Sequence, residues 1–293
     1  MSTSFRPLRG LRILSLGLNV PAPIALQRAK ALGAKVLKVE PPGGEALAQA
    51  APRAYADLNA GIRIVHKDLK TESGLAWLQA ELARCDVLLT SFRRSAMDRL
   101  GLSWRTLQRA HPQLWHVAVV SGQGQRADEA GHDLTYQAEV GLLAPGSPMP
   151  RSLLADMAGA EQATQALLMA ALGRLQGARP RYLEIGLAEA AAELARPVTW
   201  GVTAPGAVLG GGHAFYRFLR CQDGWVALAA LEPHFAARVA QVAGLAAGWN
   251  PMGVETHRAV ARWVRRQTGA ALRELARTQD LPLVVCPDAP NGG

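Results

Sequence analysis

Short apolar runs alternate with longer helical segments along the first two thirds of the chain. Residues 11–17 form an apolar run that ends on glycine, which predicts a buried strand. A helix is predicted at 21–32, because proline is tolerated in a first helical turn and Gly33 follows as a stop. Residues 34–40 predict the next strand, and a helix of this length between two strands makes a right-handed parallel βαβ unit.

The alternation continues to residue 196. Further strands are expected at 62–69, 86–90, 114–120 and 181–185, and helices at 71–82, 100–110, 163–176 and 187–196. The helix at 163–176 is apolar nearly all round, which predicts burial on every side. Together these elements predict an α/β fold, with a doubly wound, mostly parallel, Rossmann-like sheet in a large domain. The G-x-G-x-x-G fingerprint of dinucleotide binding is absent from the first βα turn.

A second, smaller domain is predicted after a stretch rich in glycine, alanine and proline at 201–212. The segments that follow look like a hairpin at 215–219 and 225–229, turned at 222–224, and then helices at 232–242, 256–268 and 270–277. The predicted division is therefore a large α/β domain at 1–200 and a small α+β domain at 201–293.

Composition and charge narrow the class of protein. A hydrophobic content of 49% with 19% charged residues is that of a globular chain, and the net charge is +9. The arginines are scattered rather than interleaved with aromatics, so we expect a small phosphate-bearing molecule and no nucleic acid as partner. Three distant cysteines predict neither a disulfide framework nor a metal site. Residues 1–6 lack a signal-peptide core and no segment is long enough to span a bilayer, so a cytoplasmic protein without a membrane partner is expected.

A histidine and two carboxylates stand out as candidate chemistry. His132 lies in the run Gly131-His132-Asp133, and Asp156 lies in the run 153–159, which follows about 20 residues later. Glu232 precedes a proline in the predicted small domain. An imidazole that titrates near neutrality and a carboxylate can act as a pair of proton carriers. The structural alternatives are a solvent-facing His132, an Asp156 that only caps a helix for ~1 kcal/mol, and a Glu232 that only favours a helix dipole.

Several motifs, in order along the chain, resemble those of the family III CoA-transferases. They are LRGLRIL at 8–14, LGAKVLKVEPPGG at 32–44, DLK at 68–70, SFRR at 91–94, RLGL at 99–102 and SGQGQ at 121–125. This superfamily includes CoA-transferases and the α-methylacyl-CoA racemases. The resemblance covers most of residues 8–290, and the Gly-His-Asp run at His132 is similar to the racemase branch, where transferases usually have an aromatic residue.

The resemblance implies an acyl-CoA enzyme of the racemase type, which moves a proton from one face of the thioester α-carbon to the other through an enolate. His132 and Asp156 would be the opposed proton carriers, and Glu232 would pair with the histidine and fix its tautomer. Backbone amides near Asp156 and Met157, at a helix start, would stabilise the enolate oxygen.

The resemblance also implies a binding site for CoA. No cofactor is bound permanently and no metal is expected, because CoA arrives as part of the acyl-CoA substrate. The residues expected around CoA are Lys38, Lys67, Asp68, Leu69, Lys70, Phe92, Arg93, Arg99, Gly131, Asp133 and Tyr136.

Two other functions stay open at this stage. One is a family III CoA-transferase in which Asp156 is the nucleophile. The other is a catalytically silent relative that binds CoA. The tract after Asp156, Ala158-Gly159-Ala160-Glu161-Gln162, has fewer glycines than the family pattern. The resemblance also implies a homodimer, and because the chain ends at Asn291-Gly292-Gly293 we expect it to be less interlocked than in the family.

Overall fold

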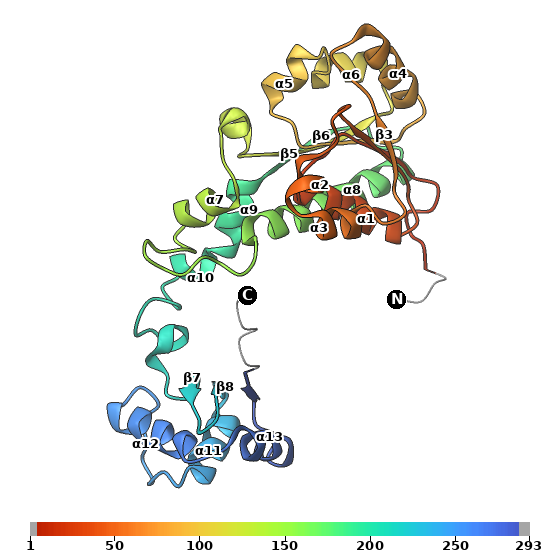
Figure 1. Ribbon diagram of the computed structural model, residues 1–293. Helices are drawn as coiled ribbons and strands as arrows, with labels where there is room; N and C mark the ends of the chain where they lie inside the picture. The colour runs from red at the N-terminus through yellow and green to blue at the C-terminus, as the bar shows by residue number, and fades with distance from the viewer. Residues whose placement is uncertain (1–4, 287–293) are drawn as a thin grey trace. The chain divides into compact units, whose positions relative to one another are not determined.

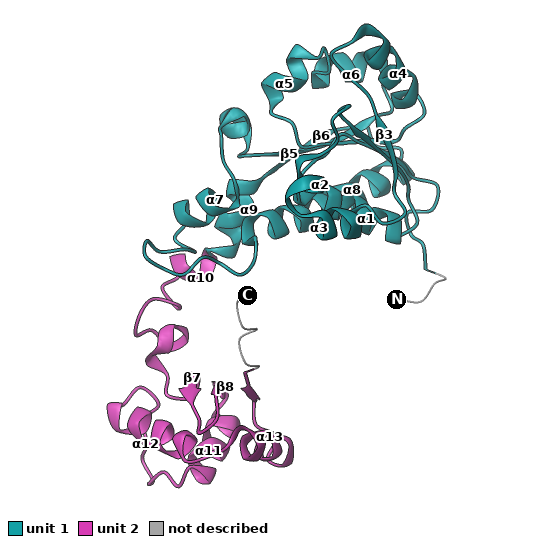
Figure 2. Ribbon diagram, in the orientation of Figure 1, with its two compact units in different colours: residues 1–195 teal, residues 196–293 magenta. Residues whose placement is uncertain are grey.

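The chain divides into two compact units. The computed structural model describes residues 5–286, and Figure 2 shows unit 1 up to Ala195 and unit 2 from Arg196 onward. The observed boundary lies a few residues before the predicted one at 200 and 201.

Unit 1 is built on a sheet of six parallel strands in the order β3-β2-β1-β4-β5-β6. Their bounds are β1 Arg12–Ser15, β2 Lys35–Glu40, β3 Arg63–His66, β4 Val87–Thr90, β5 Trp115–Val120 and β6 Tyr182–Gly186. The chain runs outward from β1 to β3 and then returns to place β4 on the other side of β1. This order confirms the doubly wound fold that the sequence predicts.

Helices cover both faces of this sheet (Figure 1). Side chains alternate along each strand, so Ile13 and Leu89 join one apolar cluster with α1 and α8, while Leu14 and Leu88 join another with α4 and α6. The helices of unit 1 are α1 Pro21–Ala31, α2 Ala46–Ala50, α3 Pro52–Leu58, α4 Glu72–Leu82, α5 Arg94–Arg99, α6 Trp104–Ala110, α7 Asp133–Glu139, α8 Leu154–Leu175 and α9 Leu187–Leu194, with a 3-10 turn η1 at Gly124–Asp128.

Helix α8 begins well before its predicted start at 163, because its first half packs through small residues. A Cβ on Gly159 would lie 2.3 Å from the end of the Leu187 side chain of α9, so a larger residue here would require Leu187 to move. The prediction that the helix is buried on every side is wrong. Its second half exposes a row of large apolar side chains, of which Met169 is 58% and Leu172 is 55% exposed.

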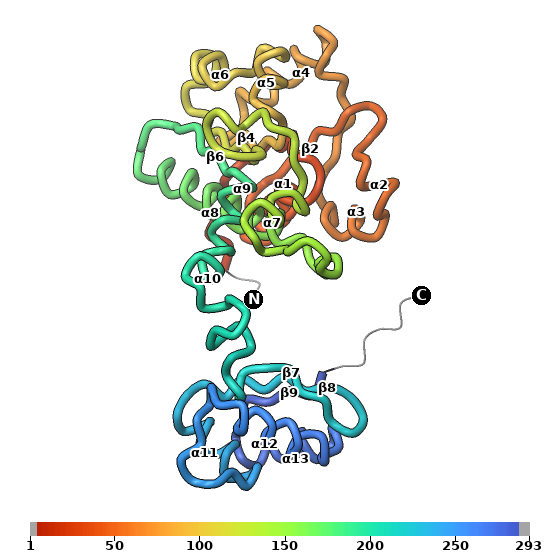
Figure 3. Tube along the Cα trace, turned by 90° about the vertical axis from the view of Figure 1, so that its left-hand side faces the viewer, coloured from red at the N-terminus to blue at the C-terminus, as the bar shows by residue number. Residues whose placement is uncertain are grey.

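Unit 2 has a three-stranded antiparallel sheet in the order β7-β8-β9. Its elements are α10 Arg196–Thr199, a π turn η2 at Val208–Gly212, β7 Tyr216–Arg220, β8 Trp225–Ala229, α11 Pro233–Val242, α12 Val254–Arg265, α13 Gly269–Thr278 and β9 Leu283–Val285. The three helices α11 to α13 lie on one side of the sheet (Figure 3), where Val226, Val260 and Leu272 share one core. The hairpin and helices agree with the predicted small α+β domain. Within residues 5–286, no helix has the length and apolar character needed to span a membrane.

Candidate active site

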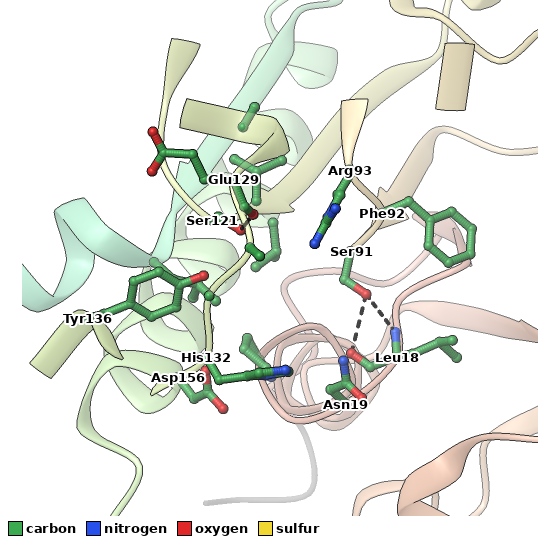
Figure 4. Close-up of a pocket in the computed structure, with 17 residues that line it drawn as sticks. Leu18, Asn19, Ser91, Phe92, Arg93, Ser121, Glu129, His132, Tyr136 and Asp156 are labelled. Atoms are coloured by element: carbon green, nitrogen blue, oxygen red, sulfur yellow. Dashed lines mark hydrogen bonds between the residues drawn. The ribbon is translucent and has the colours of Figure 1, made fainter. Parts of the chain in front are cut away.

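A cavity of about 280 Å³ opens at the carboxyl ends of β1, β4 and β5. Strands β1 and β4 flank the point where the strand order reverses, which is where open α/β sheets bind their ligands. The loop after β1 supplies Leu18 and Asn19, the loop after β4 supplies Ser91 to Arg93, and Ser121 follows β5. Figure 4 shows these side chains around the cavity together with His132, Tyr136 and Asp156. We call this the switch-point cavity.

The loop before α7 carries His132 into the cavity. The His132 backbone is clamped by Thr135, whose Oγ1 accepts the His132 N–H at 3.1 Å and donates to the His132 carbonyl at 2.7 Å. Gly131 packs against the side chain of Tyr136, and a Cβ at Gly131 would lie 2.6 Å from the ring. The imidazole itself is exposed and lines the cavity, where a bound substrate can reach it.

Asp156 projects into the same cavity from the first turn of α8, not from the N-cap, which is Leu153. Burial raises the pKa of Asp156, and the nearby carboxylate of Asp133 raises it further. His132 lowers it in part, and the resulting pKa is about 6. A carboxyl group with such a pKa exchanges protons readily near neutral pH. The structure thus brings together the two residues that the sequence singled out as proton carriers.

Asp133 has a structural role beneath them. Its Oδ1 accepts the backbone N–H of Ala155 at 2.8 Å and of Asp156 at 3.1 Å, and its other oxygen accepts from Gln137. Asp133 is only 6% exposed and does not line the switch-point cavity. The contact with CoA expected of Asp133 is thus replaced by capping of α8.

The amide contacts expected at the start of α8 are not available. The Asp156 N–H is bound by Asp133, and the Met157 N–H donates to the Leu153 carbonyl at 2.9 Å. The prediction that these amides stabilise an enolate oxygen is therefore wrong for the structure as it stands, because both donors already have acceptors.

Two carboxylates outside the predicted set fasten the loop at 121–125. Glu184 accepts the Gly124 N–H at 2.8 Å, and Glu189 accepts the Gln123 N–H at 3.1 Å. Ser121 is fixed as well, since its hydroxyl donates to the Glu129 carbonyl at 2.7 Å. This part of the cavity wall is therefore held in place. Sequence spacing gives no sign of these contacts, which join residues about 60 positions apart.

A second cavity of about 210 Å³ lies at the carboxyl ends of β2 and β3. Five residues predicted to bind CoA line it: Lys67, Asp68, Leu69, Lys70 and Phe92. Leu18 and Phe92 line both this cavity and the switch-point cavity, so the two are neighbours. We call it the Lys70 cavity.

The remaining predicted cations differ in accessibility. Arg93 is exposed and lines the switch-point cavity, and Arg99 is exposed at the end of α5 but lines neither cavity. Lys38 is fully buried, with its ammonium 2.5 Å from Glu45 and 3.0 Å from Glu40. The phosphate contact predicted for Lys38 is wrong, because two carboxylates already enclose the charge.

Glu232 lies in unit 2, as the N-cap residue of α11. Its pairing with His132 stays a prediction. In the part of the chain that the structure describes, no three His, Cys, Asp or Glu residues come close enough to hold a metal ion.

The match to a protein family covers nearly the whole chain. Residues 8–286 match the model of CoA-transferase family III, and the chain belongs to this family. Alpha-methylacyl-CoA racemase of Homo sapiens is 31% identical over 248 residues, which are 78% of this chain and 62% of that protein. The probable fatty acyl-CoA transferase Rv3272 of Mycobacterium tuberculosis is 32% identical over 66% of this chain and 53% of its own length. The chain thus spans less than two thirds of the length of these relatives.

The fold of a solved structure agrees with this assignment. The crystal structure of Rv3272 from Mycobacterium tuberculosis superposes with a TM-score of 0.84 at 25% identity, over 97% of this chain and 84% of that one. Other relatives are named as CoA-transferases, among them succinate–glutarate CoA-transferase of Agrobacterium fabrum, which is 27% identical over 203 residues.

Proposed function

We propose that the protein is an acyl-CoA enzyme of the α-methylacyl-CoA racemase type, which transfers a proton at the thioester α-carbon. The observation that carries the proposal is that His132 and Asp156 line one cavity at the switch point of the sheet. Inversion at a carbon requires a proton carrier on each face of that carbon, and two such groups on one cavity can supply this. The 31% identity with the human racemase supports the same chemistry.

In the proposed reaction one carrier removes the α-proton as a base. The C–H electron pair forms a double bond between the α-carbon and the carbonyl carbon, and the carbonyl π pair moves onto the oxygen to give an enolate. The other carrier then donates its proton to the opposite face of the α-carbon. For one enantiomer Asp156 is the base and the protonated imidazole of His132 is the acid, and for the other enantiomer the roles reverse. A pKa of about 6 for Asp156 keeps both of its protonation states accessible near neutrality.

The Lys70 cavity is the proposed site of the CoA nucleotide. Lys70 is exposed there, and the Lys67 ammonium lies 5.3 Å from the centre of the Trp77 ring, which keeps a cation at the cavity edge. The thioester arm would pass Leu18 and Phe92 into the switch-point cavity, where Arg93 adds positive charge. Arg99 does not line either cavity, and we propose that it contacts the CoA nucleotide from outside the Lys70 cavity.

A family III CoA-transferase is the second candidate, favoured by the relatives named as CoA-transferases. In that reaction Asp156 would attack the thioester carbonyl, release CoA as a thiol and form a mixed anhydride. A catalytically silent CoA-binding protein is the third candidate, because an intact cavity is sufficient for binding alone.

Two further features belong to the proposal. Glu232 would orient the His132 imidazole, as a carboxylate does in a triad. The protein would act as a homodimer, and the exposed apolar row on α8, which includes Leu168, Met169 and Leu172, supports such an interface.

Solvent deuterium exchange at the α-carbon of a 2-methylacyl-CoA distinguishes the candidates. The racemase reaction predicts exchange in the wild type and its loss in His132→Ala and Asp156→Asn. A control carboxylate on α8 is Glu161, whose side chain is 59% exposed and which lies outside the cavity, so Glu161→Gln should keep exchange. Absence of exchange together with an acyl group on Asp156 that hydroxylamine traps would favour the transferase. CoA binding with neither result would favour the silent relative.

A further inference from the structure

Asn19 occupies an unusual backbone conformation at the edge of the switch-point cavity. Its φ is 68°, in the left-handed region that few residues other than glycine adopt. Among residues 5–286 only Asp280 shares this property outside the glycines. Asn19 lines the cavity together with His132 and Asp156, and in Figure 4 the His132 ring points toward it. Strained residues of this kind are often found at functional sites.

A buried ion network holds Asn19 in this conformation. The Asn19 backbone N–H donates a short hydrogen bond to Oε1 of Glu45, and Oε2 of Glu45 lies 2.5 Å from the Lys38 ammonium. Lys38 also contacts Glu40 at 3.0 Å and Asn59 at 3.0 Å. The two carboxylates and the lysine are each at most 3% exposed. The backbone N–H of Asn19, in a surface loop, is therefore fixed by a hydrogen bond to a buried, ion-paired carboxylate.

The side-chain amide of Asn19, by contrast, is exposed and has no hydrogen-bond partner within the described chain. Most other donors around the cavity are occupied. The hydroxyl of Ser91 donates to the Leu18 carbonyl at 3.2 Å, the hydroxyl of Ser121 to the Glu129 carbonyl, and the Asp156 N–H to Asp133. Arg93, His132 and the Tyr136 hydroxyl remain, but the first is a cation suited to phosphate, the second is a proton carrier and the third is buried beside Ser121.

We propose that the side-chain amide of Asn19 binds the carbonyl oxygen of the acyl-CoA thioester and stabilises the negative charge that this oxygen gains in the enolate. This inference rests on the proposed acyl-CoA function and names the group that replaces the occupied amides of α8. Glu45 is the positioning residue, because it acts only through the Asn19 backbone.

The amide takes no part in proton transfer. As the α-proton leaves to His132 or Asp156, the C–H electron pair forms the carbon–carbon double bond of the enolate and the carbonyl π pair moves to the oxygen. The Asn19 N–H···O hydrogen bond then strengthens. When the second carrier returns a proton to the carbon, the charge leaves the oxygen and the hydrogen bond weakens. A preorganised donor of this kind stabilises the transition state more than the bound substrate.

The first test measures binding, so it does not depend on turnover. Calorimetric titration compares acetyl-CoA with S-ethyl-CoA, a thioether in which a CH₂ group replaces the carbonyl. The wild type should prefer acetyl-CoA by about three- to tenfold, as one neutral hydrogen bond gives. Asn19→Gly, which keeps the left-handed backbone and removes the amide, should abolish the preference. Asp280→Gly, at the other non-glycine residue with positive φ, should keep it.

The second test measures the exchange reaction. Asn19→Gly should lower kcat for α-carbon exchange by roughly 100-fold, with a smaller change in KM. Asn19→Asp, which keeps the shape but has no donor when ionised, should also be slow. Glu45→Ala should reduce the acetyl-CoA preference and Glu45→Gln, which retains an acceptor for the Asn19 N–H, should restore it.

The outcomes separate this inference from the proposed function. A wild type that shows no preference for acetyl-CoA, or an Asn19→Gly variant that keeps both the preference and full kcat, overturns the role of Asn19. A wild type that prefers acetyl-CoA through Asn19 but exchanges no α-proton overturns the racemase reaction and leaves the oxygen-binding role of Asn19 supported.

Discussion

The Oδ1 atom of Asp133 accepts the backbone N–H of Asp156 from 3.1 Å, so one buried carboxylate caps the helix that carries the other into the cavity. The contact stabilises the first turn of α8 and fixes the position of Asp156. Burial is the main cause of the raised pKa of Asp156, and the negative charge of Asp133 is the second. Asp133 therefore fixes the position of a proposed proton carrier and adds to the effect of burial on its proton affinity.

The first prediction concerns the pH dependence of exchange. Asp156 has a pKa of about 6, so the rate in the direction that uses Asp156 as base should rise as pH increases through 6. Asp133→Asn retains an oxygen that can cap α8 but removes a negative charge, which should move this rise to lower pH. Exchange rates measured across this range for both proteins test the prediction. An unchanged midpoint in Asp133→Asn would contradict it.

The second prediction concerns stability. The folded-state pKa of Asp156, about 6, lies above its ordinary value of 3.8, so the folded protein opposes ionisation of this group. The free-energy cost of ionising Asp156 in the folded protein is absent when pH is below 3.8. It grows as pH rises and is complete above 6. Asp156→Asn should therefore raise the free energy of unfolding at neutral pH by roughly 1–3 kcal/mol, and by much less near pH 4. Denaturant titrations at the two pH values check this, and a gain that is the same at both would exclude the ionisation as its cause.

The third prediction concerns Gly131, where a Cβ would lie 2.6 Å from the Tyr136 ring. Gly131→Ala should displace the ring or the loop that carries His132, lowering stability by about 1–3 kcal/mol and slowing exchange. Gly43→Ala is the matched control, because a Cβ there meets nothing within 4 Å. In the double variant Gly131→Ala/Tyr136→Ala the two losses of stability should not add, because the new methyl group then meets no ring. Full stability and activity in Gly131→Ala alone would show that this contact is unimportant.

The fourth prediction contrasts two lysines that the sequence placed together near CoA. Lys38 is fully buried between carboxylates, so Lys38→Met should lower the free energy of unfolding by about 3–5 kcal/mol. Lys70 is exposed, so Lys70→Met should leave stability nearly unchanged and weaken CoA binding, most clearly at low salt. Thermal unfolding and titration with CoA measure the two effects. A stable Lys38→Met with reduced CoA affinity would restore the original assignment of Lys38.

The parallel sheet could be predicted from the sequence because its strands are short apolar runs between capped helices. Helices α2 and α3 could not, since neither contains a buried residue and neither shows an apolar face. Strand β9 was missed as well, because three residues, Leu283–Val285, carry no periodic pattern.

The candidate site was predictable to the extent that the resemblance covered it. His132 and Asp156 carry the family's motifs and line one cavity. The burial of Lys38 was not predictable, because its partner Glu45 lies in a loop whose path the sequence does not specify. Asn19 was overlooked for a similar reason, since a left-handed φ in an asparagine leaves no trace in composition or spacing.

The most direct test of the central claim starts from one pure enantiomer of a 2-methylacyl-CoA in deuterium oxide. Mass spectrometry and chiral analysis then follow deuterium at the α-carbon and the ratio of enantiomers. The account predicts that the wild type incorporates one deuterium and drives the mixture toward equal amounts of both enantiomers, and that His132→Ala and Asp156→Asn do neither. A wild type that binds the thioester but leaves both its α-hydrogen and its configuration unchanged would contradict the account.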